Sequence, residues 1–167
     1  NLGARGQQGS GAMSEPIVVL GAGAFGTALA NQAARNGARV VLWARDPAHV
    51  EEMRRARENA RRLPGVKLAA SVEPSADLAR LRDARVVLAA TPAQALRGVA
   101  RAAQPFARHG ADWLICAKGI ERGTHSFLSD IVAAELPGAV ASILSGPSFA
   151  EDIAAGLPTA ITLVFPD

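Results

Sequence analysis

Short apolar runs alternate with amphipathic segments along most of the chain. A strand that is covered on both faces has a nearly continuous run of apolar side chains, so these runs predict buried strands. The clearest runs lie at residues 17–20, 40–43, 86–90, 113–117 and 140–144, and two weaker ones lie at 67–71 and 159–164.

The segments between the runs have the apolar spacing and the end signals of helices. Asp46-Pro47 and Thr91-Pro92 each place a capping residue before a proline at the first helical position. Helices are therefore predicted at residues 25–36, 47–60, 74–81, 92–103, 124–135 and 149–155. The repeated strand–helix–strand order predicts the α/β class: a Rossmann-like, doubly wound, mainly parallel sheet with helices on both faces.

The length of 167 residues fits one large domain with its own core. Residues 1–12 are rich in Gly and Gln and show no periodicity, so we interpret them as a disordered cloning remnant. The folded domain is expected at 13–167. No apolar run is long enough to span a membrane and no secretory signal is recognisable, so we expect no membrane insertion.

The net charge is +3, and aromatic residues make up 4% of the chain. A basic domain can bind nucleic acid, but the arginines are scattered, and their densest group, at residues 54–62, fits a solvated helix face. We therefore expect no nucleic-acid partner. Cys116, the single cysteine, is interpreted as a small buried hydrophobe in a reducing compartment. His109 and His125 lack metal-ligand spacing, so no metal site is expected.

The run VLGAGAFGTALA contains Gly21, Gly23 and Gly26 in the spacing G-x-G-x-x-G, after a predicted strand and at the start of a predicted helix. In dinucleotide-binding turns the first glycine allows the tight turn, the second lets the backbone approach the pyrophosphate, and the third lets the helix pack on the strand. The helix N-terminus offers N–H groups to the anion. We interpret 13–167 as an NAD(P)-binding Rossmann domain; a glycine-rich turn without a ligand is the alternative.

The end of the second predicted strand, LWARDP, bears on the choice of dinucleotide. An acidic residue there holds the ribose 2′-hydroxyl of NAD, whereas an arginine accommodates the 2′-phosphate of NADP. Asp46 has nearly the expected spacing but resembles a helix cap, and Arg45 precedes it. The sequence favours NADP(H), with NAD(H) possible. The alternative for Arg45 is an exposed surface side chain.

Ligands of open α/β sheets bind outside the carboxyl ends of the strands, so all these strand ends should line one crevice. Lys118 follows a predicted strand, and its ammonium can hold an anionic or carbonyl oxygen there. A lysine that extends along the surface into water is the alternative. Ser148, before the last predicted helix, offers a hydroxyl for a second contact, or serves as a plain helix cap.

Four longer runs, GAGAFGTALA, LWARDP, CAKGIERGT and LSGPSFAEDIAAGLPTAI, resemble the N-terminal cofactor domain of bacterial-type NAD(P)-dependent glycerol-3-phosphate dehydrogenase. The resemblance extends over residues 15–165, and its last run is the most specific. It implies a cytoplasmic enzyme that interconverts sn-glycerol 3-phosphate and dihydroxyacetone phosphate by hydride transfer with NAD(P)(H), feeding phospholipid synthesis.

The resemblance also implies roles for single residues. Ala24 and Phe25 match cofactor contacts, although family members often carry Ser and Tyr there. Arg45 matches a position near the adenosine ribose, and Lys118 matches a lysine that contacts both cofactor and substrate. The remaining matches are Ala150 for the cofactor, and Gly146 and Ser148 for the substrate.

The family has a second, helical domain that carries the general acid/base lysine and most phosphate contacts. This sequence lacks it, so the resemblance implies a cofactor domain that is inactive alone, from an enzyme that is a homodimer when complete. Two alternatives stay open: another two-domain dehydrogenase, similar to ketopantoate reductase or 6-phosphogluconate dehydrogenase, and a stand-alone dinucleotide-binding module. The run GPSFAEDIAAGLPT argues against the first of these.

Overall fold

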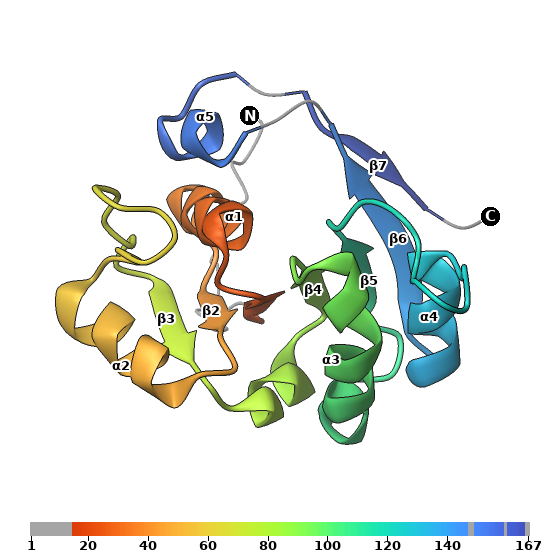
Figure 1. Ribbon diagram of the computed structural model, residues 1–167. Helices are drawn as coiled ribbons and strands as arrows, with labels where there is room; N and C mark the ends of the chain where they lie inside the picture. Colours follow the sequence, from red (N-terminus) through yellow and green to blue (C-terminus); the bar gives the residue numbers. More distant parts are fainter. Residues whose placement is uncertain (1–14, 147–148, 159, 166–167) are drawn as a thin grey trace, which may run out of the picture.

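The computed structural model describes residues 15–146, 149–158 and 160–165 (Figure 1). The predicted remnant at residues 1–12 lies outside this part of the chain. Within it, seven strands form one sheet: β1 (Ile17–Leu20), β2 (Val40–Trp43), β3 (Val72–Ser75), β4 (Val86–Ala89), β5 (Asp112–Ile115), β6 (Val140–Ser145) and β7 (Thr162–Val164). The α-helices are α1 (Ala24–Arg35), α2 (Pro47–Ala56), α3 (Leu96–Ala103), α4 (Leu128–Glu135) and α5 (Ala150–Ala154). Short 3₁₀ helices are η1 (Leu78–Asp83), η2 (Ala93–Ala95) and η3 (Gln104–Phe106).

The strands lie in the order β3-β2-β1-β4-β5-β6-β7. Every neighbouring pair is parallel except β6 and β7, which are antiparallel. The chain builds outward from β1 to β3 and then returns to β4 on the other side of β1, so the winding reverses between β1 and β4. Open α/β sheets bind their ligands at such a switch point. The predicted Rossmann-like, mainly parallel sheet is confirmed.

Each face of the sheet is covered by its own apolar core. On one face, α3 and α4 bury Leu96 and Ile131 against the strands. On the other face, α1, α2 and α5 bury Leu29, Met53 and Ile153. Helices α1 and α5 lie side by side, as do α3 and α4 (Figure 1). Helices on both faces leave the ends of the strands as the place where a ligand can reach the sheet.

The edge strand β3 lies later than the sequence predicts, so the predicted strand at 67–71 is wrong. Pro74 belongs to β3, and the predicted helix at 74–81 is wrong as well. Proline cannot donate to a sheet ladder, and it is tolerated here because β3 is the outermost strand. The helical turn is instead the 3₁₀ helix Leu78–Asp83, whose N-cap, Asp77, accepts a hydrogen bond from a backbone N–H.

Two predicted helices are shortened by residues in the left-handed conformation. The helix predicted at 47–60 ends at Ala56, because Arg57 adopts the left-handed conformation, with a φ of 51°. The helix predicted at 124–135 begins at Leu128, because His125 has a φ of 57° and cannot continue a right-handed helix. The apolar spacing extends past these breaks, so periodicity does not reveal them.

Helix α1 starts so close to the strand ends that one glycine should be indispensable. A Cβ on Gly26 would lie 2.0 Å from the carbonyl oxygen of Gly21, so we expect Gly26→Ala to destabilise the chain by about 1–3 kcal/mol or more. Gly98→Ala, in α3, is the matched control, because a Cβ there would meet no atom of the surrounding structure within 4 Å. Alanine should stabilise that helix by about 0.5–1 kcal/mol. Thermal unfolding followed by circular dichroism measures both, and equal midpoints for Gly26→Ala and the unaltered chain would contradict the close approach.

Candidate functional site

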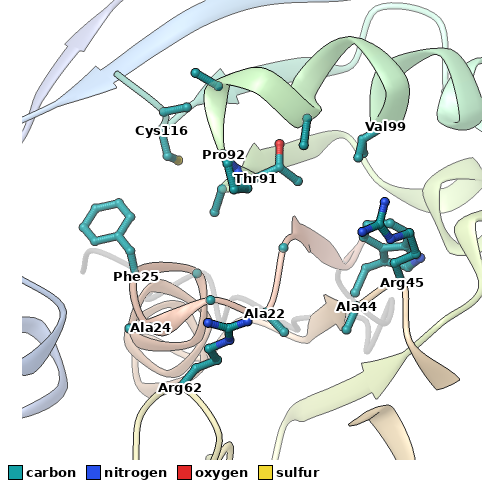
Figure 2. A pocket seen from close by; sticks show the side chains of 18 of the residues that line it. Ala22, Ala24, Phe25, Ala44, Arg45, Arg62, Thr91, Pro92, Val99 and Cys116 are labelled. Carbon is teal, nitrogen blue, oxygen red and sulfur yellow. The ribbon is translucent and has the colours of Figure 1, made fainter. Parts of the chain in front are cut away.

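A cleft of about 840 Å³ opens along the carboxyl ends of β1, β2, β4, β5 and β6 (Figure 2). Five short stretches line it, one at the carboxyl end of each of these strands: residues 21–26, 43–46, 90–93, 116–118 and 144–146. The remaining lining residues are His49, Arg62, Ala95 and Val99. The structure thus brings together the strand ends that the sequence predicts to share one crevice.

The glycine turn between β1 and α1 forms the part of the cleft nearest the switch point. Gly21 has a φ of 112°, and a Cβ there would lie 2.7 Å from the carbonyl oxygen of Ala90. A Cβ on Gly23 would meet no atom within 4 Å, so the space in front of its backbone is open. No acidic residue lies in the first turn of α1. The positive end of the helix therefore faces open space without a nearby acidic side chain of its own first turn, an arrangement that favours an anion.

Asp46 acts as the N-cap of α2, as predicted. Its Oδ1 accepts a hydrogen bond of 3.0 Å from the N–H of Ala48, and its Oδ2 lies 3.2 Å from the guanidinium of Arg61. The hydrogen bond from Ala48 and the neighbouring Arg61 lower the pKa of this carboxyl below its ordinary value. The bonds of both oxygens hold Asp46 at the helix start, where it stays ionised at neutral pH.

Two arginines from different elements place positive charge at the cleft: Arg45, after β2, and Arg62, in the loop after α2. Figure 2 shows both side chains at the cleft. Neither guanidinium forms an ion pair with a carboxylate of the described residues. By contrast, their neighbour Arg61 is bound by Asp46 and Glu52. The unpaired charges suit an anionic ligand.

Lys118 lies at the end of β5, exposed at the edge of the cleft. Its Nζ donates a long hydrogen bond of 3.4 Å to the carbonyl oxygen of Gly146, which also lines the cleft. Gly146 itself packs tightly, since a Cβ there would lie 2.2 Å from the carbonyl oxygen of Ala160. Glycine at this position is thus required by the packing of the chain between β6 and β7, whatever else it contacts.

Of the two other contacts predicted near the last helix, Ala150 is described by the structure, and it does not line the cleft. Ser148 lies outside the described residues. Ala150 begins α5 and packs against the apolar core on the side of α1 and α2. Its role in binding the cofactor therefore stays a prediction.

The segment after Lys118 is tied to the start of α3 by a network of polar contacts. The side-chain amide of Gln94 donates to the carbonyl of Ile120 at 2.9 Å and accepts from the N–H of Arg122 at 2.9 Å. Between these two contacts, both carboxylate oxygens of Glu121 lie 2.8 Å from the guanidinium of Arg97. The hydrogen bonds from Arg97 and then Thr124 lower the pKa of Glu121 to about 2.

Sequence reasoning missed His49, Arg62, Val99 and the position of Cys116 in the cleft wall. Arg62 belongs to the basic group that fits a solvated helix face, but α2 ends before it and the following loop carries it to the cleft. No periodic signal marks that turn. Burial raises the pKa of the Cys116 thiol to about 12, which supports its interpretation as a small hydrophobe and not a nucleophile.

Residues 16–167 match the family model described as the N-terminus of NAD-dependent glycerol-3-phosphate dehydrogenase. The chain is 54% identical over 151 residues to glycerol-3-phosphate dehydrogenase [NAD(P)+] of Azorhizobium caulinodans, covering 90% of this chain and 46% of the relative. It is 52% identical over 153 residues to the enzyme of the same name from a Bradyrhizobium strain, covering 92% of this chain and 47% of that protein.

Among solved structures, the chain is similar to glycerol-3-phosphate dehydrogenase from Coxiella burnetii, with a TM-score of 0.84 and 35% identity. The match covers 89% of this chain and 46% of that one. This chain therefore spans about half the length of the proteins it matches. In the part of the chain that the structure describes, no helix is long and apolar enough to cross a membrane.

The Glu121 contacts should make stability depend on pH in the acid range. Its pKa is about 2 in the folded chain and 4.5 ordinarily, so the unfolded chain binds the proton more readily. The stabilisation is complete above pH 4.5 and is lost as the pH falls towards 2. We expect Glu121→Gln to flatten the decline of the unfolding midpoint over this interval, measured by circular dichroism. Glu51→Gln, which removes an exposed carboxylate 4.0 Å from Arg54, is the control. Identical pH profiles for Glu121→Gln and the unaltered chain would contradict the assignment.

Proposed function

Because the chain belongs to the family of NAD-dependent glycerol-3-phosphate dehydrogenases, we propose that it is the cofactor-binding part of an enzyme that interconverts sn-glycerol 3-phosphate and dihydroxyacetone phosphate. The observation that carries the proposal is the glycine turn, whose open space at Gly23 lies at the N-terminus of α1. The family match does not favour the alternatives of a different two-domain dehydrogenase or a stand-alone binding module.

Within this proposal the dinucleotide is NADP(H). The carboxylate that could select NAD, Asp46, is held by the N–H of Ala48 and by Arg61. The guanidinium of Arg45 has no such partner among the described residues, and it offers paired N–H donors to a 2′-phosphate. The proposal thus assigns the ribose end of the cleft to Arg45 and the pyrophosphate to the N–H groups at residues 23–26.

Lys118 orients the substrate and stabilises charge on its oxygen. When bound, a nicotinamide cofactor would supply the chemistry of hydride transfer to and from the substrate carbon. As dihydroxyacetone phosphate is reduced, its carbonyl oxygen gains negative charge, and an ammonium group fixed at the strand end stabilises that charge. A separate group must then supply the proton. We assign that proton donor, and most phosphate contacts, to the half of the relatives that this chain does not cover.

Three further features belong to the same proposal. The complete protein acts in the cytoplasm, where the buried thiol of Cys116 stays reduced. It assembles as a homodimer, and its product feeds phospholipid synthesis.

Replacing Arg45 tests the cofactor assignment. Arg45→Ala should weaken NADPH binding about tenfold or more, because hydrogen bonds to a charged group contribute about 1.5–3 kcal/mol. NADH lacks the 2′-phosphate, so its affinity should change by less than about twofold. Arg55→Ala, which removes an exposed arginine of α2 outside the cleft, controls for net charge. Isothermal titration measures the affinities of the unaltered chain and of both variants for NADPH and NADH, and an equal loss for the two dinucleotides in Arg45→Ala would refute the assignment.

Replacing Lys118 tests the catalytic assignment. In the complete protein, Lys118→Ala should lower the rate of dihydroxyacetone phosphate reduction about a hundredfold, the usual effect of losing one such electrostatic group. Lys67→Ala is the matched control. Lys67 lies outside the cleft and forms an ion pair with Glu58 at 2.9 Å, so its replacement should leave the rate unchanged. NADPH oxidation, followed by absorbance, measures both.

The 167-residue chain alone should show no turnover in the same assay. Turnover by this chain would overturn the division of labour between the two halves. Near-normal activity of Lys118→Ala in the complete protein would show that Lys118 is an ordinary surface residue.

A further inference from the structure

A cluster of three buried polar side chains lies beneath the glycine turn, and the proposed function does not use it. Asn59 and Thr27 are fully buried, and His49 is 8% exposed. They come from three separate elements: Thr27 from α1, His49 from α2, and Asn59 from the loop after α2. Buried polar groups are costly unless they are hydrogen-bonded, so the contacts of this cluster should be strongly specified.

The contacts fix the orientation of every group in the cluster. The amide nitrogen of Asn59 lies 3.0 Å from the carbonyl oxygen of Ala22, which can only accept, so this atom must be the donor. The same nitrogen donates to the Thr27 hydroxyl at 2.8 Å, and that hydroxyl donates to the carbonyl of Gly23 at 2.7 Å. The remaining Asn59 oxygen lies 2.8 Å from Nε2 of His49, so this nitrogen carries a proton.

These bonds hold two successive carbonyl groups of the glycine turn. The carbonyl of Ala22 is bound by Asn59, and the carbonyl of Gly23 by the hydroxyl and the N–H of Thr27. In a trans peptide the C=O and the following N–H point in opposite directions. Directing the two carbonyls into the protein therefore turns the N–H groups of Gly23 and Ala24 outward. Both residues line the cleft.

Asn59 also holds the loop that brings Arg62 to the cleft. Its backbone carbonyl accepts hydrogen bonds from the N–H of Arg62 at 3.1 Å and from the N–H of Leu63 at 2.8 Å. One buried residue thus fixes the glycine turn through its side chain and the Arg62 loop through its backbone.

We propose that Asn59, acting through Thr27, is a positioning residue that sets the N–H groups of Gly23 and Ala24 to receive the cofactor pyrophosphate before the cofactor binds. The proposal rests on the dinucleotide binding proposed above. Groups arranged in advance bind an anion without the cost of reorganisation. Loss of the cluster should therefore weaken ligands that contain a pyrophosphate more than ligands that lack it.

The test compares NADPH with adenosine 2′-monophosphate, which has the 2′-phosphate but no pyrophosphate. Thr27→Val keeps the side-chain shape and removes the hydroxyl, so it should weaken NADPH about five- to tenfold, the effect of roughly one hydrogen bond. Adenosine 2′-monophosphate should lose less than about twofold. Thr27→Ser restores the hydroxyl and should restore NADPH affinity. Asn59→Leu should show the same selective loss of NADPH affinity. If Asn59→Leu does not fold, the result for Thr27→Val tests the proposal by itself.

Thermal unfolding separates positioning from plain stabilisation in the same samples. A lower unfolding midpoint for Thr27→Val with an unchanged ratio of the two affinities would overturn the proposal, because the cluster would then only stabilise the fold. So would a failure of Thr27→Ser to restore NADPH binding. If the unaltered chain binds neither ligand, the proposed function itself fails, and this inference fails with it.

Discussion

Helix α1 begins in direct contact with the ends of two neighbouring strands, and this close approach is the constraint on which the site depends. A side chain at Gly26 would meet the carbonyl oxygen of Gly21 at 2.0 Å and the Cβ of Ala90, after β4, at 3.2 Å. With glycine there, the N-terminus of α1 lies at the point where the winding of the sheet reverses. The unpaired N–H groups of the helix then face the cleft, where they can bind an anion.

Charge in the cleft points to the same kind of ligand as the helix end does. Arg45, Arg62 and Lys118 line the cleft, and Asp46 is the one carboxylate among the described lining residues. Asp46 is engaged by Arg61 and by the helix it caps. The cleft therefore has an excess of positive charge, although the whole chain carries a net charge of only +3. An elongated ligand with negative groups at several points fits this distribution.

The sequence predicts the centre of the fold better than its edges. Strands β1 and β2 have the predicted bounds, because strands covered on both faces show uninterrupted apolar runs. The edge strand β3 has the sequence VEPS, in which Glu73 and Pro74 interrupt the apolar run, and a proline is also typical of a helix start. The glycine spacing predicted where the cleft lies. It did not predict the positions of Arg62 and Asn59, because both lie in an irregular loop. Their places depend on where α2 ends, which a left-handed Arg57 decides.

The most direct test of the account is to close the space in front of Gly23 and measure dinucleotide binding. A Cβ at this position meets nothing within 4 Å, and the φ of −77° suits any residue. Gly23→Ala should therefore unfold at the same temperature as the unaltered chain. Its methyl group would occupy the space assigned to the pyrophosphate, so NADPH titrated into this variant should bind at least about tenfold more weakly, or not at all. Unchanged NADPH affinity in the folded variant would contradict the claim that the glycine turn holds the cofactor.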